Sequence, residues 1–397
     1  MNILFVADDI QFSSGGIERV TDIQVRLLSQ HGHSCYVIYR TGICHTPFKD
    51  LFQIRYTPDQ RYHFPEEFAR SLFEEVKDFV VRNRIDMVVN TRDWPLLSVL
   101  SRKIADLLHI KHVNYIHHQI YDRQAVRRDI LNAPPSWKRS LKKTFFPLYW
   151  LCFRRKISRN YRLLYRQCDA MVILSESFRR AAVSELASYD NGEKLFVIPN
   201  PTAFERAVSE EVVDEKEKTV LIVARMEERS KNIYGALRIW ADIERSGAGE
   251  WNLEIVGDGP DLPDYKQWVE KEALRRVKFV GHVNDIQVLS DHYKRAAIFM
   301  MTSYFEGFGM TLIEAQACGC VPLAFDNFSA LHDIISDRSN GLIIPTGDYR
   351  AYTQELKLLM REDGLRRQMA LCALESCKKF NRECHYRNWE KLFEKLS

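Results

Sequence analysis

The chain has 397 residues, of which 46% are hydrophobic and 28% are charged, and its formal net charge is +4. This length predicts two globular domains of roughly 200 residues each, and the balanced composition excludes a disordered or fibrous chain. The small net charge also excludes a general nucleic-acid-binding protein, which carries a much larger basic excess.

The cellular compartment is predicted from hydropathy and cysteine usage. We find no run of about 18 apolar residues that could cross a bilayer, and the opening residues MNILFVADD predict a buried strand rather than a cleavable signal. Nine cysteines spread over both halves indicate a reducing compartment. Cys318 and Cys320 have no paired Cys or His set to complement them, so no metal site is predicted. We therefore expect a cytoplasmic protein.

Short apolar runs alternate with amphipathic helical patterns from the first residue, which is typical of a doubly wound parallel sheet. In the first half the predicted strands cover residues 3–7, 35–39, 86–90, 112–116, 170–174 and 195–199. Ligands of such sheets bind beyond the carboxyl ends of the strands. The loops that follow these strands are therefore the places to look for functional residues.

Two loops of the first half carry candidates. Gly15 and Gly16 precede a helix, where adjacent glycines let backbone amides approach phosphate or sugar, although a flexible turn is the alternative. The loop lacks the GxGxxG pattern, so NAD binding is not predicted. His117 and His118 follow a strand, and His117 is the preferred candidate to contact a sugar hydroxyl because it comes directly after the apolar run; a structural histidine is the alternative.

Residues 137–166 contain ten Lys or Arg and no acid, interleaved with aromatic residues between 145 and 153. Such a segment can form a basic amphipathic helix on an anionic membrane surface. The alternative is a helix that packs its aromatic side on the sheet and leaves its charges in solvent. Periodicity does not separate the two.

A polar stretch, 200–218, turns at Pro201 and predicts an interdomain linker. A second series of strands then follows at 219–224, 252–257, 277–281, 297–301, 321–325 and 341–345. The predicted fold is α/β, with Rossmann-like domains at 1–203 and 204–378 facing across a cleft. A C-terminal helix within 379–397 is predicted to pack back towards the first domain. The cleft is the expected active site.

The second half of the chain contains two groups of candidate functional residues. In VARMEERSKN, Arg225 follows a strand and Lys231 starts a helix, so both cations could converge on one leaving group; a solvated loop is the alternative. In SYFEGFGMTLIEAQACGC, residues 303–320, Glu306 is predicted at a loop tip and Glu314 inside a helix. The intervening glycines allow close backbone approach, and the helix start can receive an anion. Two carboxylates can accept from two separate diols, as a nucleotide sugar offers.

This combination resembles the retaining GT-B glycosyltransferases of the Glu-x7-Glu class (glycosyltransferase family 4, group 1 type) over nearly the whole chain. The most specific match runs from Glu306 to Glu314, and the pair Arg225 and Lys231 resembles the family's phosphate-binding residues. Further stretches fall in the family's order: SSGG (13–16), YIH (115–117), IPNP (198–201), IVGDGP (255–260) and VGHVND (280–285).

The resemblance implies a role for each matching position. Glu306 would lie at the donor sugar, Glu314 would hold the ribose, Arg225 and Lys231 would neutralise the departing diphosphate, and His117 would contact the sugar near the reacting carbon. The implied donor-binding residues are Gly15, Gly16, Asn200, Gly257, His282, Val283, Gly307, Phe308, Gly309, Met310, Thr311 and Glu314. No Asp-x-Asp motif is present, so neither a metal nor another cofactor is predicted.

The implied reaction is transfer of a hexose or N-acetylhexosamine with retention of configuration. The sequences of the motifs resemble those of bacterial lipopolysaccharide and capsule enzymes. This resemblance favours a UDP-sugar as the donor and leaves GDP-mannose open. The implied acceptor is a saccharide. The basic aromatic segment 137–166 predicts that it is lipid-linked, which would place the protein peripherally on the inner face of the membrane. A UDP-sugar epimerase, a sugar phosphorylase and a non-catalytic scaffold are the alternatives on this fold.

Overall fold

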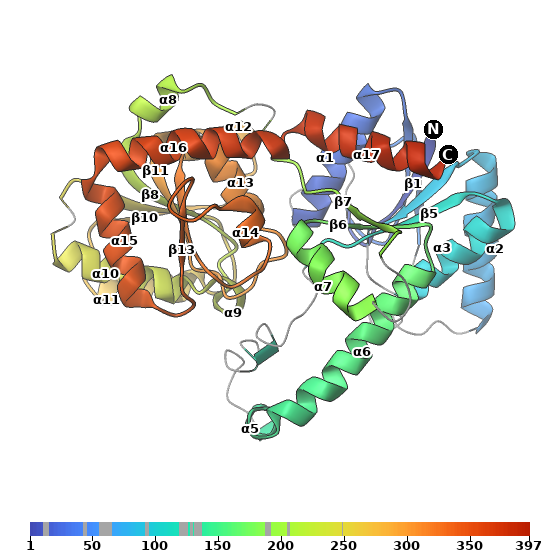
Figure 1. Cartoon of the computed structure of the whole chain (residues 1–397), viewed down its shortest axis with the longest axis horizontal. Helices are drawn as coiled ribbons and strands as arrows, with labels where there is room; N and C mark the ends of the chain where they lie inside the picture. Colours follow the sequence, from blue (N-terminus) through green and yellow to red (C-terminus); the bar gives the residue numbers. More distant parts are fainter. Residues whose placement is uncertain are drawn as a thin grey trace. The chain divides into compact units, whose positions relative to one another are not determined.

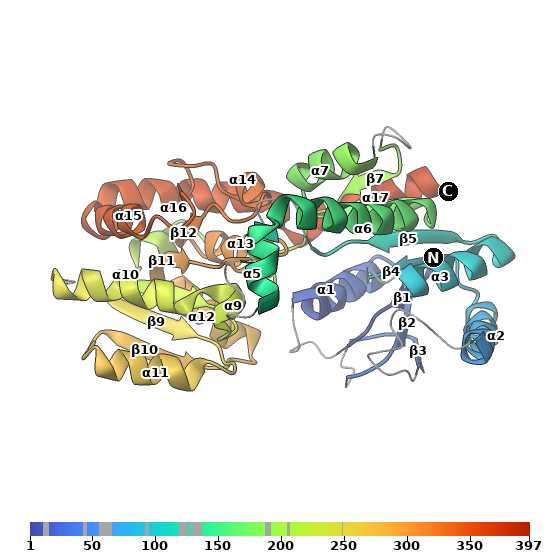
Figure 2. The same ribbon diagram turned by 90° about the horizontal axis from the view of Figure 1, so that it is seen from below.

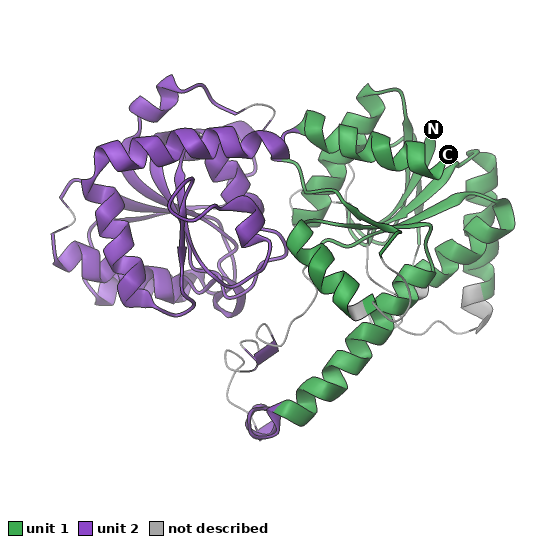
Figure 3. Ribbon diagram, viewed as in Figure 1, with its two compact units in different colours: residues 1–121, 147–201, 382–397 green, residues 122–146, 202–381 purple. Residues whose placement is uncertain are grey.

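The computed structural model describes residues 1–10, 16–42, 46–54, 66–91, 95–118, 126–127, 130, 137–186, 192–204, 207–247 and 249–397. The chain forms two compact units, coloured separately in Figure 3. Unit 1 comprises residues 1–121, 147–201 and 382–397, and unit 2 comprises residues 122–146 and 202–381. Each unit is built on its own parallel sheet (Figure 1). The predicted fold class of two Rossmann-like domains is confirmed.

The sheet of unit 1 has seven parallel strands in the order β3-β2-β1-β4-β5-β6-β7. These are β1 (Asn2–Val6), β2 (Ser34–Tyr39), β3 (Asp50–Gln53), β4 (Met87–Asn90), β5 (Lys111–Tyr115), β6 (Ala170–Ile173) and β7 (Leu195–Val197). The helices of this region are α1 (Gly16–Gln30), α2 (Glu66–Arg82), α3 (Pro95–Leu108), α6 (Phe146–Arg166), α7 (Glu176–Leu186) and α17 (Arg382–Leu396).

The sequence patterns predicted six of these strands and missed β3. Its four residues, DLFQ, alternate between half-buried and exposed positions, and it pairs with β2 at the end of the strand order. An edge strand keeps one side in solvent, so it needs no continuous apolar run. The prediction therefore missed β3 because its residues are partly exposed.

The sheet of unit 2 has six parallel strands in the order β10-β9-β8-β11-β12-β13. These are β8 (Glu217–Val223), β9 (Asn252–Val256), β10 (Val277–Gly281), β11 (Ala296–Met301), β12 (Val321–Phe325) and β13 (Leu342–Ile344). The helices are α5 (Trp137–Thr144), α8 (Glu211–Asp214), α9 (Glu228–Lys231), α10 (Ile233–Arg245), α11 (Leu262–Lys271), α12 (Ile286–Arg295), α13 (Met310–Ala317), α14 (Leu331–Ile334), α15 (Tyr349–Arg361) and α16 (Asp363–Cys377). A 3-10 turn, Lys378–Phe380, follows α16.

Much of the stretch predicted as a linker, 200–218, instead packs on unit 2. It contains α8 and the first residues of β8. Val213 of α8 is buried in the core of unit 2, and Asp214 accepts from Arg367 of α16 at 2.6 Å. Val208 of the same stretch also packs against this core. Two valines in an acidic stretch are enough to hold so short a helix on a larger core, and the sequence pattern does not reveal it.

Helices cover the sheet of unit 2 through fully buried aromatic side chains. Figure 2 shows α10 between α11 and α15, and Trp240 of α10, Tyr265 of α11 and Tyr352 of α15 are almost inaccessible. The Tyr352 hydroxyl donates to the carbonyl of Leu323 at 2.7 Å, so its burial leaves no unpaired polar group. This core is the rigid support for the loops at the ends of β8 and β11.

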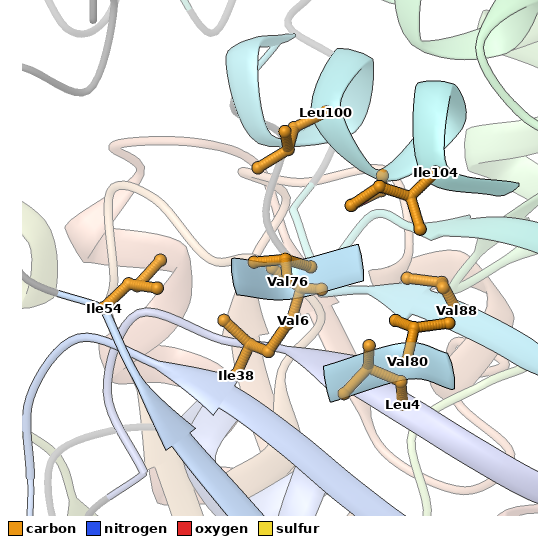
Figure 4. Close-up of a pocket in the computed structure, with 10 residues that line it drawn as sticks. Leu4, Val6, Ile38, Ile54, Val76, Val80, Val88, Leu100 and Ile104 are labelled. Atoms are coloured by element: carbon orange, nitrogen blue, oxygen red, sulfur yellow. The ribbon is translucent and has the colours of Figure 1, made fainter. Parts of the chain in front are cut away.

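A small void lies in the core of unit 1 between the sheet and helices α2 and α3 (Figure 4). Its volume is about 20 Å³. It is lined by Leu4, Val6, Ile38, Ile54, Val76, Val80, Val88, Leu100, Ser101 and Ile104. Apart from Ser101 this lining is apolar and offers a water molecule too few polar partners, so the void is a packing gap and not a ligand site.

The C-terminal helix α17 packs within unit 1 against α1 (Figure 1). Trp389 is 1% exposed, and its ring lies edge-on to Tyr115 of β5 at 5.5 Å. Tyr386 stacks on His31, the residue after α1, at 3.5 Å between ring centroids. Among the described residues, no helix is long and apolar enough to cross a membrane.

Buried His385 of α17 should make unit 1 sensitive to acid. Its Nδ1 lies 2.9 Å from the carbonyl of Pro199, which can only accept, so Nδ1 carries the proton. Its Nε2 then accepts from the indole N–H of Trp389 at 3.2 Å. Burial lowers the pKa of His385 to about 4. The unfolded chain, with a histidine pKa of about 6.5, therefore binds the proton first as the pH falls.

We expect the contribution of His385 to stability to be complete above pH 6.5 and to fall progressively towards pH 4. The loss by pH 5 is roughly 2 kcal/mol. Urea unfolding of the wild type and of His385→Gln at pH 8 and at pH 5 measures it. The difference in unfolding free energy between the two proteins should shrink at pH 5. A difference that is equal at both pH values would contradict the assignment.

Candidate active site

The strand order of unit 2 reverses between β8 and β11, the two central strands. β8 pairs with β9 on one side and with β11 on the other, in parallel register. The loops that leave the carboxyl ends of β8 and β11 therefore lie side by side, which is where open α/β sheets bind ligands. Arg225 and Lys231 follow β8, and Glu306 follows β11.

Lys231 and Glu306 meet at this point. The Lys231 Nζ lies 2.7 Å from the Glu306 Oε1, and the two side chains are 21% and 13% exposed. Together with the backbone at the ends of β8 and β11 they line a pocket of about 10 Å³. The structure thus places a cation and a carboxylate, predicted separately from positions 75 residues apart, in one partly buried ion pair.

Asn232, which the sequence analysis missed, fixes the direction in which Lys231 points. Its backbone is left-handed, with φ 52° and ψ 49°, a conformation that Asn tolerates better than most residues. Its side-chain amide donates to the carbonyl of Thr302 at 3.0 Å, and the Thr302 hydroxyl donates to the carbonyl of Asn232 at 2.9 Å. The two loops are thereby joined. An asparagine between two short helical patterns was the available signal.

Further hydrogen bonds join the same two loops. The amide of Tyr304 donates to the carbonyl of Ser230 at 2.8 Å. The Asn232 amide also reaches the hydroxyl of Tyr349, at the start of α15, at 3.3 Å. Ser230 and Asn232, on either side of Lys231, are thus both bonded to the segment that precedes Glu306, so the positions of Lys231 and Glu306 are set by backbone geometry as well as by their own attraction.

Glu228 supports the segment between β8 and α10 through its hydrogen bonds. Its Oε2 accepts from the amide of Tyr234 at 3.0 Å and from the hydroxyl of Tyr265 at 3.1 Å. Its own amide donates to the Oδ2 of Asp261 at 2.7 Å. Burial raises the pKa of the Glu228 carboxyl, and the hydrogen bonds from Tyr234 and Tyr265 oppose that rise. Glu228 is therefore a positioning residue at the junction of α9 and α10.

Gly257, predicted to bind donor, lies against the loop that carries Arg225. Its φ is 137°, and a Cβ there would lie 1.9 Å from the carbonyl oxygen of Ala224. The amide of Ala224 donates to Val256 at 3.0 Å, so the two segments are in backbone contact. Gly257 is thus required for the packing of this loop, next to the exposed side chain of Arg225.

Gly309 caps the start of α13 with φ 95°. A Cβ at Gly309 would lie 3.1 Å from the ring of Phe328. The side chain of Phe308 is 3% exposed, and its ring lies edge-on to Phe380 at 5.8 Å. Phe308 therefore anchors the loop in the core. Gly307, Met310 and Thr311 are half-buried at the helix start.

The second acid of the motif has a different environment from the first. Glu314 lies within α13 and is fully buried, and its Oε2 accepts from the hydroxyl of Tyr293 at 3.0 Å. A buried carboxylate needs such partners to offset its loss of water. The eight-residue spacing thus places Glu306 beside a cation in a pocket and Glu314 inside unit 2.

His282 and Val283 follow β10, which is separated from β8 by β9. His282 is exposed, with Nε2 2.8 Å from the Oδ1 of Asn284, and Val283 is half-buried. Among the described residues, no group of three or more His, Cys, Asp or Glu side chains could hold a metal ion. Metal independence remains a prediction.

The candidates of unit 1 gather partly around Tyr115 of β5. His117 is 7% exposed, and its ring lies 3.9 Å from that of Tyr115. The Tyr115 hydroxyl donates to the Oδ1 of Asn200 at 3.1 Å. Gly16 begins α1, with open space where a Cβ would stand, whereas Gly15 lies outside the described residues. Tyr115 was not predicted, although it precedes His117 by two positions.

Comparison with known families adds an independent finding. The model described as "Glycosyltransferase Family 4" matches residues 14–206, and the model described as "Glycosyl transferases group 1" matches residues 204–373. The two matches meet near the point where the chain passes from unit 1 to unit 2.

One similar curated protein is the GalNAc-alpha-(1->4)-GalNAc-alpha-(1->3)-diNAcBac-PP-undecaprenol alpha-1,4-N-acetyl-D-galactosaminyltransferase of Campylobacter jejuni. It is 25% identical over 236 residues, which are 59% of this chain. The match spans 62% of that relative's length.

Two solved structures have the same fold. The lipopolysaccharide outer core galactosyltransferase WaaB, in its apo form, is 16% identical with a TM-score of 0.71, and the match covers 100% of both chains. Anabaena Alr3699/HepE in complex with UDP is 14% identical with a TM-score of 0.69, again over 100% of both chains. At these identities the likeness shows the architecture alone.

Proposed function

Because the chain belongs to glycosyltransferase family 4 of the group 1 type, we propose that it transfers a hexose or N-acetylhexosamine from a nucleotide sugar to a saccharide acceptor. The observation that carries the proposal is the Lys231–Glu306 pair at the ends of β8 and β11. It places a cation and a hydrogen-bond acceptor at the edge where parallel sheets bind ligands.

The leaving group of such a transfer is a nucleoside diphosphate, whose negative charge grows as the bond to the sugar breaks. A cation held in position before the reaction stabilises that charge without reorganisation. Lys231 is held in this way by Asn232 and Glu306. Arg225 supplies a second positive charge, and the first amides of α13 supply partial positive charge.

Glu306 has two roles in this proposal. It holds the Lys231 ammonium at 2.7 Å, and its other oxygen can accept a hydroxyl of the transferred sugar. The roles of Glu314 at the ribose and of His117 at the sugar stay part of the proposal; because both side chains are buried in this structure, donor binding would have to expose them. We also propose that the transfer retains the configuration of the reacting sugar carbon. We propose that it needs no metal, because fixed side chains stabilise the charge of the leaving group.

We propose UDP as the nucleotide and a lipid-linked saccharide as the acceptor, in the synthesis of a surface polysaccharide. The UDP complex of the Anabaena structure supports the first, and the undecaprenol-linked substrate in the name of the Campylobacter relative supports the second. An acceptor of this kind implies a cytoplasmic protein in peripheral contact with the inner face of the membrane.

Thermal unfolding in the presence of UDP, GDP or ADP and of their sugars tests the donor. A ligand at about 100 times its Kd stabilises the folded protein by about 2.7 kcal/mol, so UDP and one UDP-sugar should raise the melting temperature most. Lys231→Ala should remove most of the shift produced by UDP itself, because its diphosphate carries the full charge of the leaving group and loses its cation. Equal shifts from the three nucleotides would contradict the proposal.

The reaction itself is tested by product analysis. A transferase releases UDP in proportion to added acceptor. An epimerase would convert the UDP-sugar without any acceptor, and a phosphorylase would require inorganic phosphate. Binding of a nucleotide sugar with no turnover in the presence of a range of saccharide acceptors would favour a non-catalytic scaffold.

A further inference from the structure

Helix α5 exposes an apolar side bordered by basic residues. None of its eight residues, all of which the structure describes, is buried. Trp137 and Leu141 are 70% and 49% exposed, and their spacing of four places them on one side of the helix. Lys138 and Lys142 form a second row with the same spacing. The helix is amphipathic and its apolar side meets no protein core.

Helix α6 divides into two halves with different surroundings. In its C-terminal half Tyr161, Leu164 and Tyr165 are buried in unit 1, and the carbonyl of Leu164 accepts from Asn114 of β5 at 2.7 Å. In its N-terminal half Leu148 and Leu151 are 62% and 45% exposed. Figure 1 shows that half extending away from the sheet of unit 1.

The two sequence alternatives for residues 137–166 therefore apply to different parts of it. The C-terminal half of α6 packs on the fold, whereas residues 137–157, here named the basic apolar segment, contain no buried side chain. Leu148, Leu151 and Arg155 are spaced by three and four, so an arginine follows the two leucines along one side of α6.

Exposed apolar side chains concentrate in this segment. Ten large hydrophobic side chains of the described residues are exposed, and five of them belong to residues 137–151. They are Trp137, Leu141, Phe145, Leu148 and Leu151. Soluble proteins rarely gather exposed apolar groups in this way unless the surface binds another surface.

We propose that the basic apolar segment inserts its exposed apolar side chains into an anionic lipid bilayer. The charges select this occupant: residues 137–157 carry seven Lys or Arg and no acid, which matches anionic headgroups. A second copy of the chain would bring the same positive charge and be repelled. The inference deepens the proposed function and rests on it, because a lipid-linked acceptor gives the protein a reason to bind a membrane.

Vesicle flotation separates insertion from charge attraction alone. The vesicles are phosphatidylcholine with and without phosphatidylglycerol, and no donor or acceptor is added. The apolar variant changes three exposed side chains of the segment, Trp137→Ser, Phe145→Ser and Leu148→Ser. Its matched control changes three exposed side chains elsewhere, Val81→Ser, Leu107→Ser and Val288→Ser.

We expect the wild type to float with phosphatidylglycerol vesicles and the apolar variant to lose at least about tenfold in binding, since each buried CH₂ adds to membrane affinity. The control should bind like the wild type. Equal binding by the apolar variant would overturn insertion. A variant that keeps vesicle binding but shifts from dimer to monomer in gel filtration would show that a second copy is the occupant.

The basic side chains are tested in the same assay. One variant changes three exposed cations of the segment, Lys138→Gln, Lys143→Gln and Arg155→Gln. Its control removes the same charge from the surface of unit 2, with Lys266→Gln, Lys271→Gln and Arg275→Gln. The first should reduce binding to anionic vesicles at least about tenfold, because each cation near the surface contributes. Equal losses in both would reduce the effect to net charge and overturn the proposal.

Two further measurements complete the test. Brominated lipids should quench Trp137, so wild-type fluorescence should fall more than that of Trp137→Phe, which keeps an apolar ring at this position. Equal quenching would contradict insertion. The UDP-induced rise in melting temperature should be the same in all these variants. Vesicle binding without any response to nucleotides would leave the membrane inference standing and remove the proposed function.

Discussion

Lys231→Ala is expected to lower kcat for sugar transfer by about 100- to 1,000-fold, the usual cost of removing one preorganised group that stabilises developing negative charge. The effect should be on kcat more than on KM, because the charge on the diphosphate is largest in the transition state. Acceptor-dependent release of UDP at saturating donor measures it.

The control for this prediction lies on the same short helix. Arg229 of α9 is exposed two residues before Lys231, and Arg229→Ala removes the same charge without touching the pocket. It should retain kcat within about threefold, since a solvent-screened charge contributes little. If both variants lost activity equally, the net charge of the loop would matter and the placement of Lys231 would not.

The ion pair itself can be tested with Glu306→Gln. This change keeps the shape of the side chain and removes its charge, so Lys231 loses its carboxylate partner at 2.7 Å. Because the two side chains touch, their effects on kcat should not add in the double variant. Strictly additive effects would indicate that Lys231 and Glu306 act separately, contrary to the proposed mechanism.

Gly257→Ala is expected to destabilise unit 2 by more than about 4 kcal/mol, a loss that marks a few severe structural causes. Alanine disfavours a φ of 137°, and its Cβ would lie 1.9 Å from the carbonyl oxygen of Ala224. Backbone cannot yield as a flexible side chain can. The loop that carries Arg225 must therefore shift or the segments must separate. Urea unfolding measures the loss.

Gly247→Ala is the matched control. Gly247 also has a positive φ, 94°, but nothing lies within 4 Å of the position of its Cβ. It should cost only the conformational penalty of about 1 to 2 kcal/mol. Equal destabilisation by the two variants would mean that the contact with Ala224 contributes nothing. If Gly257→Ala folds at reduced temperature, its UDP-induced shift should still be smaller than that of the wild type.

Most strands were predictable because a central parallel strand is buried on both faces and must be apolar along its whole length. Runs such as AIFMM and TVLIV therefore predicted β11 and β8. Where one side meets solvent the rule fails, as it did for β3. Helix α8 was also missed. Only one of its residues, Val213, is buried in the core of unit 2, so its sequence shows no helical apolar pattern.

The candidate residues of unit 2 were predictable for a related reason. Polar residues directly after an apolar strand lie at the carboxyl edge of a sheet, which located Arg225, Lys231 and Glu306. The supporting residues were not visible in the same way. Asn232 contacts Thr302 and Tyr349 only because β8, β11 and α15 are brought together by the fold.

The sequence by itself determined the number of domains, the parallel sheets, the loops that carry charge and the family, because strand length, periodicity and short motifs are local properties. Tertiary structure alone decided which distant residues meet and which side chains stay exposed. It paired Lys231 with Glu306, buried Glu314 beneath Tyr293, and left the first half of α6 outside the core while burying the second. Contact and exposure depend on the packing of segments far apart in the chain, and no local pattern records them.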